Sequence, residues 1–130
     1  MLTIARPAYR TKLLAILALG AVFSLPHLAL ADAGGPSVTN GAALFASNCA
    51  SCHGSNGAGG KKFGSAVAAD LQAPGLEKTY HGSDKLLLRA IMLAKDEDGE
   101  RLDHPMPAWN GKLTVAEAKD IIAYLHTLHS

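Results

Sequence analysis

The chain has 130 residues, a length typical of a single domain. Its 12 basic and 11 acidic residues leave a net charge of only +1, which gives no indication of a nucleic-acid-binding surface. Two cysteines can form at most one disulfide, so a scaffold held together by several disulfides is excluded.

Residues 1–31 are predicted to be a secretory signal peptide. Three basic residues precede an apolar run over 13–25, and residues 29–31 (Ala-Leu-Ala) provide the small residues that precede a cleavage site. The alternative is an uncleaved membrane anchor. The apolar run is short for a membrane span, and Pro26 and His27 interrupt it, so we favour cleavage after residue 31.

Cleavage would leave residues 32–130, a chain of 99 residues with nine basic and eleven acidic side chains and a net charge of −2. A chain this small buries only a modest core, so it needs a further source of stability. Export points to the bacterial periplasm. If the signal were retained, the same domain would be tethered to the outer face of the inner membrane.

Residues 32–39 are polar and rich in turn formers, which predicts a flexible lead-in to a domain over 40–130. Asn40 is a candidate N-cap for a helix over 41–50. This helix runs into the pentapeptide Cys49-Ala50-Ser51-Cys52-His53, which holds both cysteines of the chain. We therefore expect the chemistry of the protein to depend on this motif.

The pentapeptide has four interpretations. A disulfide across two intervening residues closes a very small loop and adds little stability. A thioredoxin-like dithiol belongs between a strand and a helix, and no β-rich segment precedes this one. Zinc requires four ligands, and no paired histidine spacing follows the two cysteines at a suitable distance. The fourth interpretation is covalent haem, in which the Cys49 and Cys52 thiols add to vinyl groups and His53 coordinates the iron. We predict one haem c per chain.

Helices and loops, without a strand, are predicted for the rest of the chain. Residues 54–61 form a Gly-rich surface loop, and Ala73-Pro74-Gly75 argues against a continuous helix over 64–80. A helix is predicted from the N-cap Ser83 through about Lys95, because its apolar residues recur with helical spacing. A solvated acidic loop over 96–103 should follow this helix.

The C-terminal part begins with an extended segment over 104–107, because Pro105 and Pro107 restrict the residues before them. The last helix is predicted to begin at Thr114, with Glu117 completing a capping box. Its apolar face consists of Ala118, Ile121, Ile122, Leu125 and Leu128. The predicted fold class is all-α.

A six-coordinate haem needs a second iron ligand opposite His53. Met106 is favoured because it lies in a rigid segment between two prolines, far enough along the chain for a helix to pass round the haem. Met92 is more easily a core residue, and His104 could compete with Met106 after oxidation of Met106 to its sulfoxide. The residues alone also leave other candidates open: His81, His126, His129 and a lysine.

In combination these residues resemble the class I c-type cytochromes, the small monohaem cytochrome c family. The resemblance covers about residues 40–128. It rests on Gly41, Phe45, Cys49-x-x-Cys52-His53, Pro74-x-Leu76, residues 87–91, Met106-Pro107-Ala108-Trp109 and residues 121–125. It implies the cytochrome c fold, in which three main helices pack around one covalently bound haem. The first and last helices would cross where Gly41 allows two backbones to approach closely.

The resemblance also implies a role for several matching residues. The Pro74 carbonyl would accept the Nδ1 proton of His53, and Met106 would be the second iron ligand. The indole N–H of Trp109 would reach a haem propionate. An apolar pocket is expected from Leu71, Leu76, Leu87, Ile91 and Leu113.

With both iron ligands supplied by the protein, the resemblance implies electron transfer and not catalysis at an open iron. The chain is expected to be a monomer that carries single electrons between redox protein partners, with membrane association only if the signal is retained. The alternatives are a haem enzyme or sensor and an electron-relay subunit docked on a redox enzyme. Lys61 and Lys62 form a small local pair, which does not reproduce the basic ring that some family members use for docking.

Overall fold

The computed structural model describes residues 34–130. The predicted signal peptide, residues 1–31, and the start of the predicted lead-in lie outside the described residues. Within the described part of the chain, no helix is both long enough and apolar enough to cross a membrane.

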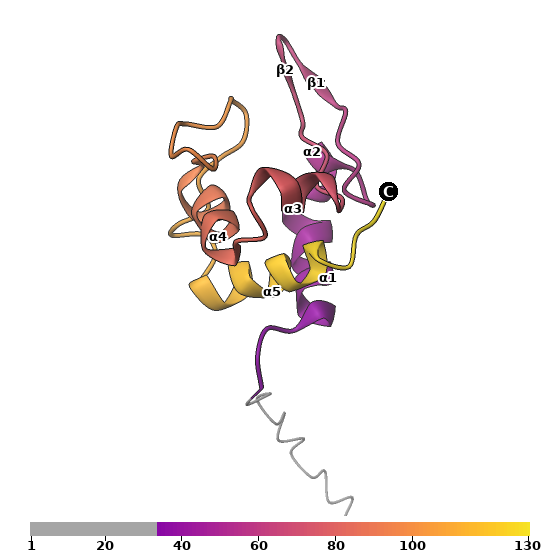
Figure 1. Cartoon of the computed structure of the whole chain (residues 1–130), viewed down its shortest axis with the longest axis vertical. Helices are drawn as coiled ribbons and strands as arrows, with labels where there is room; N and C mark the ends of the chain where they lie inside the picture. The colour runs from indigo at the N-terminus through magenta and orange to yellow at the C-terminus, as the bar shows by residue number, and fades with distance from the viewer. Residues whose placement is uncertain (1–33) are drawn as a thin grey trace, which may run out of the picture. The chain divides into compact units, whose positions relative to one another are not determined.

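Short helices joined by long loops make up most of the described fold (Figure 1). In chain order the elements are α1 (Val38–Asn48), α2 (Ala50–His53), β1 (Lys62–Phe63), β2 (Ala66–Val67), α3 (Gly75–Thr79), α4 (Asp84–Leu93) and α5 (Val115–Leu125). The prediction of an all-α fold is confirmed. The two strands form a small antiparallel hairpin, in which Lys62 pairs with Val67, and this hairpin was not predicted. Strands of two residues are too short to produce an alternating pattern.

Helix α1 begins three residues earlier than the sequence predicts. The Ser37 hydroxyl accepts a hydrogen bond from the Asn40 backbone N–H at 3.2 Å, so Ser37 is the N-cap and the prediction of Asn40 is wrong. The Asn40 side chain instead donates to Asp120 at 2.6 Å, and the same carboxylate accepts from the Ser37 N–H at 2.7 Å. Asp120 of α5 therefore binds the start of α1, where its negative charge also interacts favourably with the helix dipole.

The first and last helices cross at Gly41. A Cβ atom at this position would overlap the Asp120 carbonyl and would lie 3.0 Å from the Tyr124 Cβ, so only glycine allows the observed approach. One turn further along α1, the Phe45 ring packs against the Tyr124 ring with centroids 5.3 Å apart. The helix crossing implied by the resemblance is confirmed.

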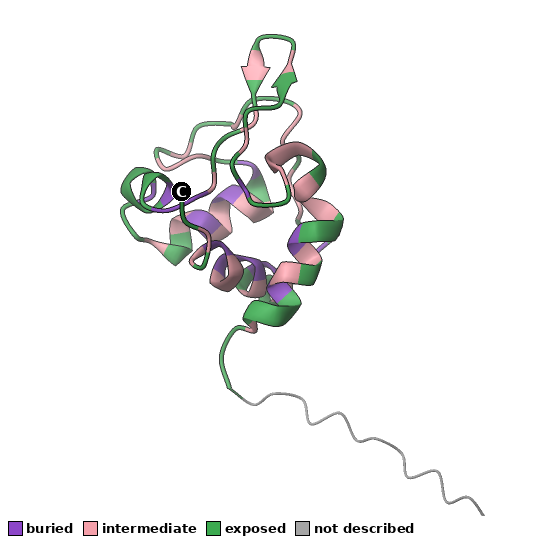
Figure 2. Cartoon of the chain, turned by 90° about the vertical axis from the view of Figure 1, so that its right-hand side faces the viewer, coloured by how far each residue is buried: buried purple, intermediate pink, exposed green. Residues whose placement is uncertain are grey.

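The core lies where α1, α4 and α5 face each other (Figure 2). Its buried members come from every helix except α2, and two lie just outside a helix, Tyr80 after α3 and Leu113 before α5. They are Phe45, Leu76, Tyr80, Leu87, Ala90, Leu113, Ile121, Ile122 and Leu125. The predicted apolar face of α5 is thus buried as expected, apart from Leu128, which lies beyond the helix end and is half-buried.

Helix α4 has the predicted N-cap but ends early. The Ser83 hydroxyl accepts from the Leu86 N–H at 3.4 Å. The helix ends at Leu93, because Ala94 adopts a left-handed conformation with φ of 50° and its carbonyl accepts from the Leu102 N–H at 2.9 Å. The predicted continuation to Lys95 is therefore wrong, and the acidic loop begins sooner than expected.

Helix α5 begins with the predicted capping box. The Thr114 hydroxyl accepts from the Glu117 N–H at 3.2 Å, and the Glu117 carboxylate accepts from the Thr114 N–H at 2.8 Å. Two hydrogen bonds to the Glu117 carboxylate hold its pKa below the ordinary value. The larger contribution comes from the backbone N–H of Thr114 and the smaller from the Thr114 hydroxyl.

We expect the capping box to stabilise the protein at neutral pH and to weaken in acid. Because the folded-state pKa of Glu117 is lowered, its contribution is fully present above the unfolded pKa of about 4.3 and is lost as the pH falls through the folded value. Thr114→Ala should raise the pKa of Glu117 part of the way towards its ordinary value. NMR titration of the Glu117 carboxylate measures this. An exposed threonine of α1, changed in Thr39→Ala, serves as control, and an equal rise in both variants would contradict the assignment.

Candidate functional site

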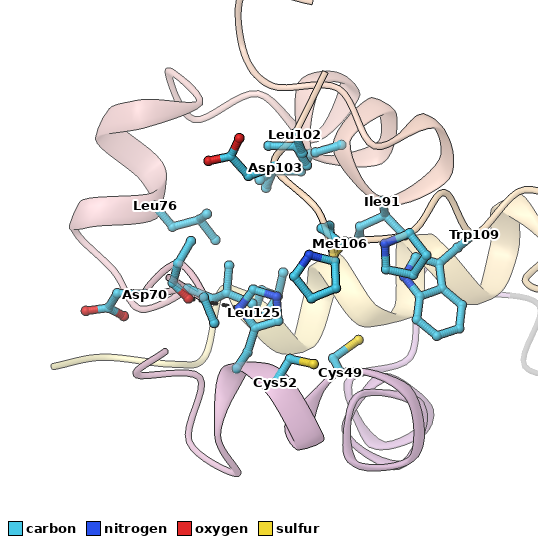
Figure 3. Close-up of a pocket in the computed structure, with 18 of the residues that line it drawn as sticks. Cys49, Cys52, Asp70, Leu76, Ile91, Leu102, Asp103, Met106, Trp109 and Leu125 are labelled. Atoms are coloured by element: carbon cyan, nitrogen blue, oxygen red, sulfur yellow. Dashed lines mark hydrogen bonds between the residues drawn. The ribbon is translucent and has the colours of Figure 1, made fainter. Parts of the chain in front are cut away.

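One cavity of about 400 Å³ occupies the space between the helices, a volume within the range of cofactor pockets (Figure 3). Its lining is mainly apolar and comes from segments that are distant in sequence. The larger apolar side chains are Phe45, Phe63, Leu71, Leu76, Leu87, Ile91, Leu102, Trp109, Ile121 and Leu125. Such a lining excludes water and suits a flat hydrophobic group.

Both cysteines line this cavity. Their sulfur atoms point into the open space in Figure 3, and the two residues are half-buried and do not form a disulfide. Cys49 lies at the junction of α1 and α2, where its N–H donates to the Phe45 carbonyl and its own carbonyl accepts from the His53 N–H at 3.0 Å. The break between the two helices at Cys49 therefore places both thiols on the cavity side.

The surroundings of Cys49 favour its thiol form over the thiolate. Burial raises the pKa of Cys49 to about 11, and the neighbouring Cys52 adds to the rise. A redox-active dithiol needs a thiolate near neutral pH, which this environment disfavours. Over residues 34–130, no three histidine, cysteine or acidic side chains group together as a metal-ion site. The zinc and dithiol interpretations therefore find no support in these residues.

His53 lines the cavity with one ring nitrogen occupied. Its Nδ1 lies 2.9 Å from the Ala69 carbonyl, which can only accept, so Nδ1 carries the proton and Nε2 keeps a free lone pair. The prediction that the Pro74 carbonyl accepts the Nδ1 proton of His53 is wrong. Pro74 is exposed and caps α3, and its carbonyl accepts from the Lys78 N–H at 3.0 Å.

The hairpin explains why Ala69 replaces Pro74 as the partner of His53. The Gly60 N–H donates to the Ala68 carbonyl at 2.9 Å, and this bond returns the chain towards the His53 ring. Gly59 has a φ of 65°, and a Cβ atom there would overlap the carbonyls of residues 68 and 69. Glycine is therefore needed for this close approach of two backbones.

Met106 lies on the opposite wall from the cysteines in Figure 3 and lines the cavity. Its N–H donates to the Asp103 carbonyl at 3.1 Å, closing a turn at His104–Pro105. The prediction of an extended segment over 104–107 is therefore wrong for its first half. A turn satisfies the Met106 N–H within the loop, which an extended chain at this position would not do.

Some of the candidates for the second iron ligand line the cavity, and the others do not. Among the described residues, Met106 and His104 are the two candidates for the second iron ligand, opposite His53, that line it. The remaining candidates named in the sequence analysis do not line it: Met92, His81, His126, His129 and any lysine of the described residues. The His126 Nε2 instead lies 2.8 Å from an Asp84 carboxylate oxygen, so this side chain links α5 to α4.

The other predicted site residues divide between cavity and core. Leu76 is buried, and both Leu76 and Trp109 line the cavity. The backbone N–H of Trp109 donates to the Ile91 carbonyl at 3.1 Å, which ties this segment to α4. Leu113 was expected in the pocket, but it packs in the core and does not line the cavity, because the chain turns between Trp109 and Leu113.

Three cavity features escaped the sequence analysis: the hairpin wall, Tyr80 and Glu97. Burial raises the pKa of Tyr80, with the carboxylates of Glu97 and Asp96 adding to the rise, so its hydroxyl remains a hydrogen-bond donor. Tyr80 lies four residues after Leu76, and this helical spacing of two large apolar side chains is a signal that could have identified it.

An apolar cavity with two unpaired thiols and a histidine from one Cys-x-x-Cys-His motif has the donor set of a covalent haem site. Comparison with known proteins supports this class. The family model described as Cytochrome c matches residues 38–129. The chain belongs to the cytochrome c family, which implies covalently bound haem c and electron transfer.

Individual relatives fall into two groups. The chain is 35% identical to cytochrome c6 of Nostoc sp. over 103 residues, which cover 79% of this chain and 76% of that protein. It is 36% identical to the cbb3-type cytochrome c oxidase subunit FixP of Azorhizobium caulinodans over 93 residues, covering 72% of this chain and 28% of FixP. The subunit CcoP of Cereibacter sphaeroides is 32% identical over 91 residues, 68% of this chain and 26% of CcoP. The chain thus spans about a quarter of the length of these oxidase subunits.

Proposed function

We propose that Cys49 and Cys52 hold haem c through two thioether bonds, and that His53 and Met106 are its iron ligands. The observation that carries this proposal is that all four side chains line one apolar cavity. The free lone pair on the His53 Nε2 supports its role as a ligand, because the Ala69 carbonyl already holds the proton on Nδ1. Trp109 and Leu76 belong to the same proposed site.

The haem supplies one-electron exchange between Fe(II) and Fe(III). The residues of the chain set the conditions for this exchange. The Ala69 carbonyl fixes the orientation of the His53 ring and increases its basicity. The apolar lining excludes water, and a methionine ligand raises the reduction potential, as the low polarity of the lining also does.

Covalent attachment can be tested at Cys52. The purified wild-type protein should retain one haem per chain after acid-acetone extraction, and its pyridine haemochrome spectrum should be that of a haem with both vinyl groups saturated. In Cys52→Ser the α band should shift to longer wavelength, because one vinyl group remains. The control is Ser51→Ala within the same motif, which should leave the band unchanged. Extractable haem in the wild type would contradict the proposal.

We further infer that the protein works as a diffusible carrier in the periplasm after removal of residues 1–31. Its similarity to cytochrome c6 over most of both chains supports a free carrier. The similarity to the oxidase subunits FixP and CcoP favours a second candidate, an electron-relay subunit of a redox enzyme. Gel filtration of the protein with detergent-solubilised membranes of its own organism separates the two. A free carrier elutes at its own size at physiological ionic strength, whereas a subunit elutes with the larger complex.

A further inference from the structure

Charge is unevenly distributed along the described chain. Within residues 34–69, Lys61 and Lys62 are the only side chains among lysine, arginine, aspartate and glutamate. Every acidic side chain of residues 34–130 lies at or beyond Asp70, and five of them fall within residues 96–103. Residues 34–130 carry nine basic and ten acidic side chains, so the net charge of this part is −1 although the segment up to residue 69 is positive.

The two lysines belong to the hairpin, which stands out from the helices in Figures 1 and 2. We define the hairpin face as Lys61, Lys62, Phe63, Ala66 and Val67, of which the cross-strand partners Lys62 and Val67 point to the more exposed side and Phe63 and Ala66 to the other. Phe63, Ala66 and Val67 line the cavity, yet Val67 is 57% exposed. The hairpin is therefore a thin wall, with the cofactor cavity on one side and solvent on the other. A protein that contacts the hairpin face approaches the cofactor closely.

The positive charge on the hairpin face has a defined position. The Lys61 Nζ donates to the Ser51 carbonyl at 2.9 Å, inside the Cys-x-x-Cys-His motif, and lies 5.3 Å from the centroid of the Phe63 ring. The Lys61 carbonyl in turn accepts from the Ala68 N–H at 2.8 Å. An ammonium held in this way sets the local potential beside the Cys-x-x-Cys-His motif, whereas a mobile surface lysine is averaged over many positions.

We propose that the hairpin face is the docking surface for a redox protein whose contact face has an apolar centre bordered by carboxylates. The inference rests on the proposed electron-transfer function. Charge complementarity selects this partner, because the hairpin face has two lysines and no acidic residue. The acidic side chains of residues 96–103 disfavour binding of the same partner through the other side of the cavity, where Glu97 and Asp103 line it. Val67, the exposed cross-strand partner of Lys62, places an apolar side chain beside this positive charge and allows close contact.

The electrostatic part of the proposal is tested with ferricyanide, a trianion that takes one electron from the reduced protein and becomes ferrocyanide. Lys62→Glu should reduce the bimolecular rate constant at low ionic strength by about threefold or more. Lys119→Glu, on an exposed site of α5, changes the net charge equally and should have a clearly smaller effect. Equal effects of the two variants would show that only net charge matters and would overturn the proposal.

The docking part is tested with a strongly acidic blue-copper protein, whose Cu(II) accepts one electron from the reduced protein. Val67→Asn removes apolar contact without changing charge, and it should lower this rate constant by a clearly larger factor than it changes the ferricyanide rate constant. Val115 is similarly exposed, at 51%, and Val115→Asn should leave both rates unchanged. No difference between the two valine variants would overturn docking on the hairpin face. Absorption spectra of each variant report the iron ligands, so a failure of the proposed haem site is distinguished from a failure of docking.

Discussion

Gly41→Ala is expected to destabilise the haem-loaded protein by about 3 kcal/mol. The new methyl group would overlap the Asp120 carbonyl, and neither backbone can move without separating α1 from α5. Helix propensity alone predicts the opposite sign, because alanine is favoured over glycine by about 1 kcal/mol in a helix. Denaturant unfolding followed by circular dichroism gives the free energy of unfolding.

The control for this prediction lies on the exposed side of the same helix. Ala43→Gly should cost only about 1 kcal/mol, because nothing packs against Ala43 as closely as α5 packs against Gly41. A Gly41→Ala protein that is as stable as the wild type would show that the two helices do not cross at this residue.

Met106→Ala should open one coordination site of the iron. The oxidised protein would lose the weak absorption band near the red end of the spectrum that reports coordination of methionine to Fe(III). The reduced protein would bind carbon monoxide. The reduction potential should fall by on the order of 0.2 V, a part of the roughly 0.8 V range over which axial ligands set haem potentials. Absorption spectra and a redox titration measure these changes.

Met92 provides the matched control, because it lies in α4 and does not line the cavity. Met92→Ala should keep the band, the potential and the lack of reaction with carbon monoxide. If Met106→Ala keeps the band, Met106 is not the iron ligand. His104, which also lines the cavity, could occupy the open site in Met106→Ala, and the double variant with His104→Ala would then bind carbon monoxide more readily.

Features that depend on neighbouring residues in the sequence were predicted well. The capping box of Thr114 and Glu117 needs only a three-residue spacing, and the buried face of α5 follows from helical periodicity. The start of α1 was not predicted, although Ser37 is an equally good cap. The choice between Ser37 and Asn40 depends on Asp120, which is 80 residues from Asn40 in sequence and binds the Asn40 side chain.

The site shows the same division. The cysteines, His53 and Met106 could be proposed from a motif and a proline-flanked methionine, but the carbonyl that binds the His53 Nδ1 could not. A backbone carbonyl has no signature in the sequence, because every residue carries one. Its position depends on the hydrogen bonds at the base of the hairpin and on Gly59, whose role becomes visible only from the contact with residues 68 and 69.

The hairpin also has a consequence for protein engineering and for divergence among related chains. Hydrogen bonds between residues 60 and 68 and between residues 68 and 61 close it at its base, so the residues beyond this point are not needed to hold Ala69 at His53. Lengthening a loop costs little, about 0.6 kcal/mol for each doubling. Insertions at the turn around Gly64 should therefore be tolerated. The turn at residues 64 and 65, which does not line the cavity, is a position at which partner preference can change while the cofactor site stays the same.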